Sequence, residues 1–131
     1  GAERIYHHTA PSHNFYALHE SLRLVLEEGL EPRWQRHREA HERFVRGAAE
    51  LGLELAGHEG RRLPQLNVVR IPEGVDDKAT RRELLERHGI EIGGGLGELA
   101  GKVWRVGLMG HGARPEVVDR LLAALATVLK A

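Results

Sequence analysis

The sequence predicts an α+β domain, in which a small antiparallel or mixed sheet has helices packed on one face and follows a long bent helical segment. Three observations support this fold class. Apolar residues recur at three- and four-residue spacing from His13 to Leu51, with a break at Gly29–Pro32. Short β-branched runs follow, and they are few in number. The connections between them are too short for a doubly wound parallel sheet.

The helical segment is expected to follow an extended stretch over residues 1–12. A first helix is predicted from His13 to Glu28, with Phe15, Leu18, Leu22, Val25 and Leu26 on one face. Gly29 is a plausible stop, and Pro32 suits the first turn of a second helix, which is expected to end at Gly52. One side of the second helix carries Trp34, His37, His41, Phe44, Val45, Ala48 and Leu51.

The rest of the chain alternates between predicted strands and helices. The strands are Leu53–Ala56 as a possible edge, Leu66–Ile71, Ile90–Ile92 and Lys102–Leu108. Asp76 can cap a helix that runs to His88 and ends at Gly89, with Leu84 and Leu85 facing inward. Pro115 begins a last helix, whose apolar face is Val118, Leu121, Leu122, Leu125, Val128 and Leu129.

Composition limits the function classes. The 131 residues suffice for one domain, and 19 basic residues balance 19 acidic ones, so no general attraction to nucleic acid or membrane is expected. Cysteine is absent, which excludes thiolate catalysis and cysteine-ligated zinc. No apolar run approaches the roughly 18 residues of a membrane-spanning helix. We therefore expect a soluble domain in the cytoplasm.

The most informative segment is Ile90–Gly110, which reads IEIGGGLGELAGKVWRVGLMG. Its second apolar run contains one cation, Arg105, between Trp104 and Val106. Burying an unpaired guanidinium costs several kcal/mol, so Arg105 is expected at a water-filled cleft or against an anion. An anionic ligand is the first hypothesis, and a structural ion pair is the alternative.

Two other motifs in the chain are not interpreted as sites. Gly95–Ala100 matches G-x-G-x-x-A, but a strand-like run follows instead of the helix that a dinucleotide site requires. His37 and His41 share a helical face, yet Arg38 stands where a zinc protease needs glutamate, and no third ligand is evident. No metal site is predicted.

The N-terminal motif Tyr6-His7-His8-Thr9 allows two interpretations. The hydroxyls of Tyr6 and Thr9 could both donate to a phosphate near a helix start. Alternatively, Thr9 or Ser12 caps the helix that follows, and the residues alone favour this second interpretation.

Three stretches together are similar to one family: Tyr6–Pro11 (YHHTAP), Tyr16–Leu18 leading to Glu27–Glu31, and Ile90–Gly110. They resemble the C-terminal part of pyridoxal-phosphate (PLP) aminotransferases of class V, fold-type I, of the alanine–glyoxylate and serine–pyruvate type. The resemblance covers nearly the whole chain. It implies an α+β small domain over residues 13–131, a homodimer, and a catalytic site between this domain and a large PLP-binding domain.

The resemblance also implies roles for particular residues. Arg105 corresponds to the arginine that grips the α-carboxylate of the substrate, a role that suits the bidentate geometry of a guanidinium. Tyr6 and Thr9 correspond to residues that reach the cofactor phosphate of the neighbouring subunit. Gly93, Gly94 and Gly95 are expected in the wall of the active-site mouth.

The family's cofactor-attaching lysine, its pyridine-nitrogen aspartate and its ring-stacking aromatic belong to the large domain. None of the three lysines here, Lys78, Lys102 and Lys130, has that lysine's context. No catalytic residue is therefore assigned in this chain, which alone is expected to be inactive and not to retain PLP.

The complete enzyme would move an amino group between alanine or serine and glyoxylate or pyruvate. The alternatives are a stand-alone dimerisation module and a small anion-binding domain. If the helix over His13–Glu28 normally packs on the large domain, its apolar face is exposed here and favours self-association.

Overall fold

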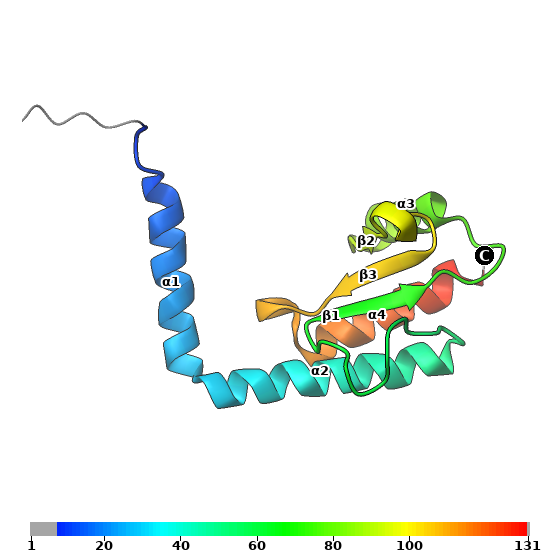
Figure 1. The fold of residues 1–131 in the computed structure, drawn as a ribbon, viewed down its shortest axis with the longest axis horizontal. Coiled ribbons are helices and arrows are strands. Elements are labelled where there is room, and N and C mark those ends of the chain that lie inside the picture. The colour runs from blue at the N-terminus through cyan, green and yellow to red at the C-terminus, as the bar shows by residue number, and fades with distance from the viewer. Residues whose placement is uncertain (1–7, 131) are drawn as a thin grey trace, which may run out of the picture. The chain divides into compact units, whose positions relative to one another are not determined.

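The computed structural model describes residues 8–130, so Tyr6 lies outside the described residues (Figure 1). The chain divides into two units, residues 1–33 and 34–131.

The first unit contains helix α1, Ser12–Glu28. Pro11 occupies the N-cap position and no side chain caps the helix, so the expectation that Thr9 or Ser12 caps it is wrong. Gly29 ends the helix at φ 83°, and its N–H donates to the carbonyl of Val25. None of the residues in α1 is buried, and the exposed side chains include Phe15, Tyr16, Leu18, Leu22 and Leu26. The predicted apolar face is thus exposed, and self-association stays a prediction.

Helix α2, Leu30–Glu50, starts two residues earlier than Pro32 and enters the second unit at Trp34. Its buried side chains are Ala40, Phe44 and Ala48, which recur every four residues and define one face. Trp34 lies on the same predicted side but is 57% exposed. The first buried apolar residue of this helix, Ala40, therefore lies about three turns after its start.

The sheet has three antiparallel strands, β1 Leu66–Arg70, β2 Gly93–Gly94 and β3 Val103–Gly107, in the order β1-β3-β2. The expected edge strand at Leu53–Ala56 is reduced to a single bridge between Leu55 and Val69.

The strand expected at Ile90–Ile92 is wrong, because pairing with β3 is made by the two glycines that follow. The Ile90 N–H instead donates to the Leu84 carbonyl and completes the end of the preceding helix.

Helix α3, Asp77–His88, has the predicted caps: the Asp76 carboxylate accepts from the Ala79 N–H at 2.7 Å, and Gly89 is left-handed. Leu84 is fully buried, but Leu85 is 49% exposed, so its predicted inward position is wrong. Successive helical residues point about 100° apart, and only one of this pair can face the sheet.

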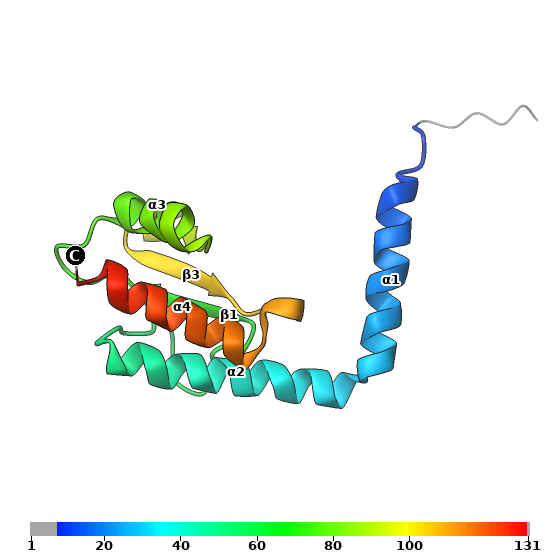
Figure 2. The same cartoon turned by 180° about the vertical axis from the view of Figure 1, so that it is seen from behind.

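Helix α4, Pro115–Val128, begins at the predicted proline and buries Val118, Leu121, Ala124, Leu125 and Val128. Figure 2 shows α4 lying along the sheet, with α3 and the later part of α2 to either side. The core lies between these helices and one sheet face, which carries Asn67, Val69, Trp104 and Val106. The α+β fold with helices on one sheet face is confirmed. No helix within residues 8–130 has the length and apolar character needed to cross a membrane.

Candidate functional site

Arg105 lies in the middle of the central strand β3, where it pairs with Val68 on one side and Gly93 on the other. Its neighbours Trp104 and Val106 are 1% and 3% exposed and point into the core. Successive side chains of a strand point to opposite faces, so Arg105 projects from the sheet face away from the core. The side chain is partly buried there.

The Arg105 guanidinium is held against strand β2. Its Nε donates to the Gly94 carbonyl at 2.7 Å. A Cβ placed on Gly93 would lie 3.2 Å from Nη2, 3.4 Å from Nε and 3.5 Å from Cζ of Arg105. These near-equal distances show that the guanidinium lies flat over Gly93, in the space that a side chain would fill.

Arg105 forms no ion pair with any acidic side chain in residues 8–130. The structural ion pair that was the alternative explanation is therefore not found in this part of the chain. With Nε occupied by Gly94, the Nη groups remain to donate to a planar anion such as a carboxylate. The anion-binding role of Arg105 stays a prediction.

The glycine segment before β3 forms a tight turn. A Cβ on Gly95 would lie 1.9 Å from the Leu99 carbonyl oxygen, so only glycine fits at this position. A short 3-10 helix, Gly97–Leu99, follows, and β3 begins at Val103. The regular helix that the dinucleotide motif requires does not follow Gly95. The place of Gly93, Gly94 and Gly95 in the wall of an active-site mouth stays a prediction.

Thr9 is described and exposed, and it precedes α1 in the first unit. Tyr6, its expected partner in phosphate binding, lies outside the described residues. The assignment of these two hydroxyls to a cofactor phosphate therefore stays a prediction.

The two histidines of α2 each contact a different part of the second unit. His41 Nδ1 lies 2.6 Å from Asn67 Oδ1 of β1, and His37 Nε2 accepts from the Gly110 N–H at 3.1 Å. Arg36 adds bonds to the carbonyls of Gly110 and Ala113 at 2.7 and 2.8 Å. No group of metal-binding side chains is found within residues 8–130. These α2 side chains therefore tie the helix to the rest of the unit.

Sequence reasoning missed Asp77 and Arg81 of α3. Arg81 binds the Asp77 carboxylate through Nε at 2.7 Å and Nη2 at 3.2 Å, and the buried Trp104 Nε1 donates to the same carboxylate at 3.0 Å. The bond from Arg81 lowers the pKa of Asp77, with a smaller contribution from Trp104, and the pKa of Arg81 is raised in turn. The four-residue spacing signals this ion pair, but nothing local indicates the contact with β3.

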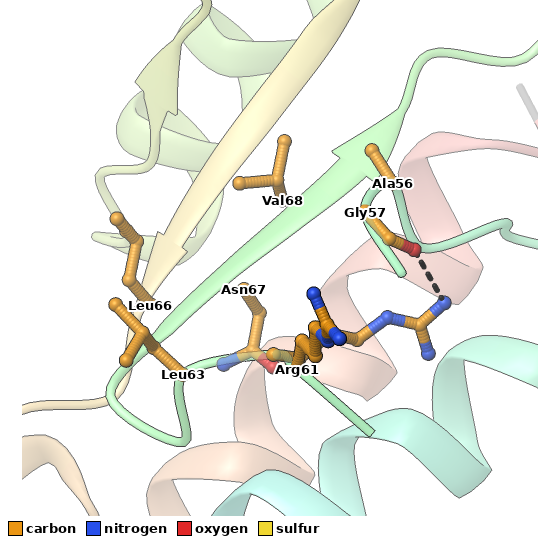
Figure 3. A pocket seen from close by; sticks show the side chains of 8 residues that line it. Ala56, Gly57, Arg61, Leu63, Leu66, Asn67 and Val68 are labelled. Atoms are coloured by element: carbon orange, nitrogen blue, oxygen red, sulfur yellow. Dashed lines mark hydrogen bonds between the residues drawn. The ribbon is translucent and has the colours of Figure 1, made fainter. Parts of the chain in front are cut away.

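A separate hollow of about 200 Å³ lies beside β1, and Figure 3 shows the side chains that line it. Apolar side chains including Leu63, Leu66 and Val68 line it, and Arg62 at its edge donates to the Gly57 carbonyl at 3.4 Å. Neither Arg105 nor the glycines of β2 line this hollow. It is therefore not part of the Arg105 site.

Over nearly its whole length the chain is similar to the C-terminal part of alanine–glyoxylate and ureidoglycine–glyoxylate aminotransferases, which is consistent with a C-terminal part of a class V aminotransferase. The crystal structure of an alanine–glyoxylate aminotransferase from Nostoc sp. superposes with a TM-score of 0.90 at 56% identity, over 98% of this chain and 34% of that one. The (S)-ureidoglycine–glyoxylate transaminase of Bacillus subtilis is 45% identical over 96% of this chain and 30% of its own length. The alanine–glyoxylate aminotransferase of Oryctolagus cuniculus is 44% identical over 99% of this chain and 33% of its own length.

The chain thus spans about a third of the length of these relatives. No family model matches it. The predicted resemblance is confirmed, and the interpretations as a stand-alone dimerisation module or a small anion-binding domain are not favoured.

Proposed function

We propose that the protein containing this chain is a PLP-dependent aminotransferase. It moves an amino group between a small amino acid, alanine or serine, and a 2-oxo acid, glyoxylate or pyruvate. Residues 13–131 act as its small domain. A large PLP-binding domain and a second subunit complete a cytoplasmic homodimer. The observation that carries the proposal is the oriented guanidinium of Arg105 without an acidic partner in residues 8–130.

Arg105 suits a substrate carboxylate for a physical reason. Strand pairing on both sides fixes its backbone, and the bond from Nε to Gly94 fixes the plane of its guanidinium. Two parallel N–H groups can then meet both oxygens of an α-carboxylate, which orients the amino acid as well as binding it. A lysine would supply the charge without that orientation.

The residues of this chain fit only the phosphate end of the cofactor. Lys78, Lys102 and Lys130 are all exposed, and none has the sequence context of the family's cofactor-attaching lysine. The Thr9 hydroxyl, with that of Tyr6, would donate to the phosphate. PLP, when bound, accepts the electrons released at the α-carbon of the amino acid. Its covalent attachment is assigned to the remaining two thirds of the enzyme.

The proposal is tested by Arg105→Ala and Arg105→Lys in the full-length protein, assayed for amino transfer from alanine to glyoxylate. Losing a charge-assisted bidentate contact costs about 3 kcal/mol, so Arg105→Ala should lower kcat/KM roughly 100-fold. Arg105→Lys should recover only part of that loss. Arg46→Ala, which removes an exposed arginine of α2, is the matched control and should leave kcat/KM unchanged. Wild-type kcat/KM in Arg105→Ala would contradict the role of this residue.

A further inference from the structure

Strand β2 lies between two guanidinium groups. Gly93 and Gly94 are successive strand residues, so their missing side chains would point to opposite faces of the sheet. Arg105 covers Gly93 on one face. On the other, a Cβ at Gly94 would lie 3.3 Å from Nη2, 3.4 Å from Cζ and 3.5 Å from Nε of Arg81. Arg81 therefore lies flat over Gly94 as Arg105 lies flat over Gly93.

The orientation of Arg81 is fixed by its bidentate contact with Asp77, whose carboxylate also accepts from Trp104. Trp104 is 1% exposed and pairs with Gly94 across the β3–β2 ladder. The Asp77 and Arg81 side chains are 17% and 30% exposed, so water only partly screens the pair. Helix α3, strand β3 and strand β2 are thus joined through one carboxylate and one guanidinium.

We propose that Arg81 and Asp77 are positioning residues for Arg105. The planar Arg81 side chain holds Gly94 in place from the core-facing side of β2. The carbonyl of that same glycine accepts the Nε–H of Arg105 on the other side of the strand. The inference rests on the proposed function, because it concerns how the guanidinium of Arg105 is oriented before the substrate carboxylate binds.

A two-residue strand of glycines needs such support. Glycine has no side chain to pack and more backbone freedom than any other residue, so the β2–β3 pairing alone holds Gly94 weakly. If Gly94 moves, Arg105 loses its bond to the carbonyl and its long side chain samples other rotamers. The carboxylate would then have to order the arginine on binding, and its affinity would fall.

The test compares two arginines of α3 that pair with an acidic residue four positions before them. Arg81→Lys keeps the charge opposite Asp77 but loses the flat guanidinium over Gly94. Arg87→Lys makes the same change in the exposed Arg87–Glu83 pair and is the matched control. Asp77→Asn keeps an oxygen acceptor for Trp104 and removes the charge that orients Arg81.

The readouts are taken on the full-length enzyme. Calorimetry measures the Kd of propionate, a carboxylate without an amino group, and crystal structures of the variants report the separation of Arg105 Nε and the Gly94 oxygen. Arg81→Lys and Asp77→Asn should weaken propionate binding about tenfold, with a rise in KM for alanine larger than the fall in kcat. The bond to Gly94 should be lost in both. Arg87→Lys should bind propionate within twofold of wild type.

An Arg81→Lys enzyme that keeps the bond to Gly94 and the wild-type Kd for propionate would overturn the positioning role. The same conclusion follows if Arg81→Lys weakens binding equally in an Arg105→Ala background, because the two effects would then be independent. A wild-type enzyme that neither binds propionate nor transfers amino groups would overturn the proposed function instead. Even then, retention or loss of the bond to Gly94 in Arg81→Lys decides the positioning role.

Discussion

Replacing Gly93 with alanine is expected to shift the guanidinium of Arg105 without lowering the free energy of unfolding. Gly93 does not have a positive φ, so alanine can adopt its backbone conformation. Within a strand, this exchange removes unfolded-state freedom and is expected to stabilise by about 0.5 kcal/mol where the space allows. The new methyl group, however, would lie 3.2 Å from Arg105 Nη2, closer than ordinary van der Waals contact.

The guanidinium must therefore move outward by a few tenths of an ångström. That movement stretches the 2.7 Å bond from Nε to Gly94 and tilts the plane offered to a carboxylate. A charge-assisted hydrogen bond contributes about 1.5–3 kcal/mol, and losing part of it weakens carboxylate binding by about 1 kcal/mol. We expect the Kd for propionate to rise about fivefold while the free energy of unfolding stays at or slightly above that of wild type.

Urea denaturation followed by tryptophan fluorescence gives the free energy of unfolding, and calorimetry with the full-length enzyme gives the Kd. Gly112→Ala is the matched control, because a Cβ there meets no atom within 4 Å and its φ is not positive. A Gly93→Ala enzyme with wild-type affinity for propionate would refute the reasoning, because it would show that the space over Gly93 does not set the position of Arg105.

Two further predictions concern α3 and α1. Because Arg81 holds the folded-state pKa of Asp77 below the ordinary value of 3.8, this carboxylate stabilises the fold above about pH 4 and its contribution is lost as pH falls below that value. Urea titrations at pH 5 and pH 3 should show a smaller loss of stability in Asp77→Asn than in wild type, and an equal loss would contradict the assignment. The isolated chain should self-associate through the exposed face of α1, and Leu18→Glu with Leu22→Glu should shift its sedimentation toward monomer. A wild-type chain that sediments as a monomer at high concentration would contradict this second expectation.

The helix boundaries could be predicted because their signals are local. Asp76, Gly89 and Pro115 act through bonds and dihedral angles within a few residues of themselves, and each has its predicted role. Leu85 was misplaced because helical periodicity alone does not say which of two adjacent leucines meets the sheet. Strand pairing depends on partners far away in the sequence, so local apolar character alone did not locate the strand. It was expected at Ile90–Ile92, but Gly93–Gly94 pairs with β3.

The same distinction applies to the site. Arg105 could be found from the sequence because a lone cation in an apolar strand is conspicuous wherever the strand lies. The contribution of Asp77 and Arg81 could not be found from the sequence, because it depends on contacts with Trp104 and Gly94. These two residues come from other parts of the chain. Their four-residue spacing is typical of ordinary surface ion pairs, such as Arg87 with Glu83 on the same helix.

The close approach of Gly95 to the Leu99 carbonyl has a consequence for protein engineering. A loop library aimed at new substrates cannot randomise Gly95, because any Cβ there collides with backbone. Leu96, Glu98 and Leu99 are exposed on the same turn and can be varied without disturbing the contact that closes it. Useful diversity in this loop is therefore confined to the residues between and after its glycines.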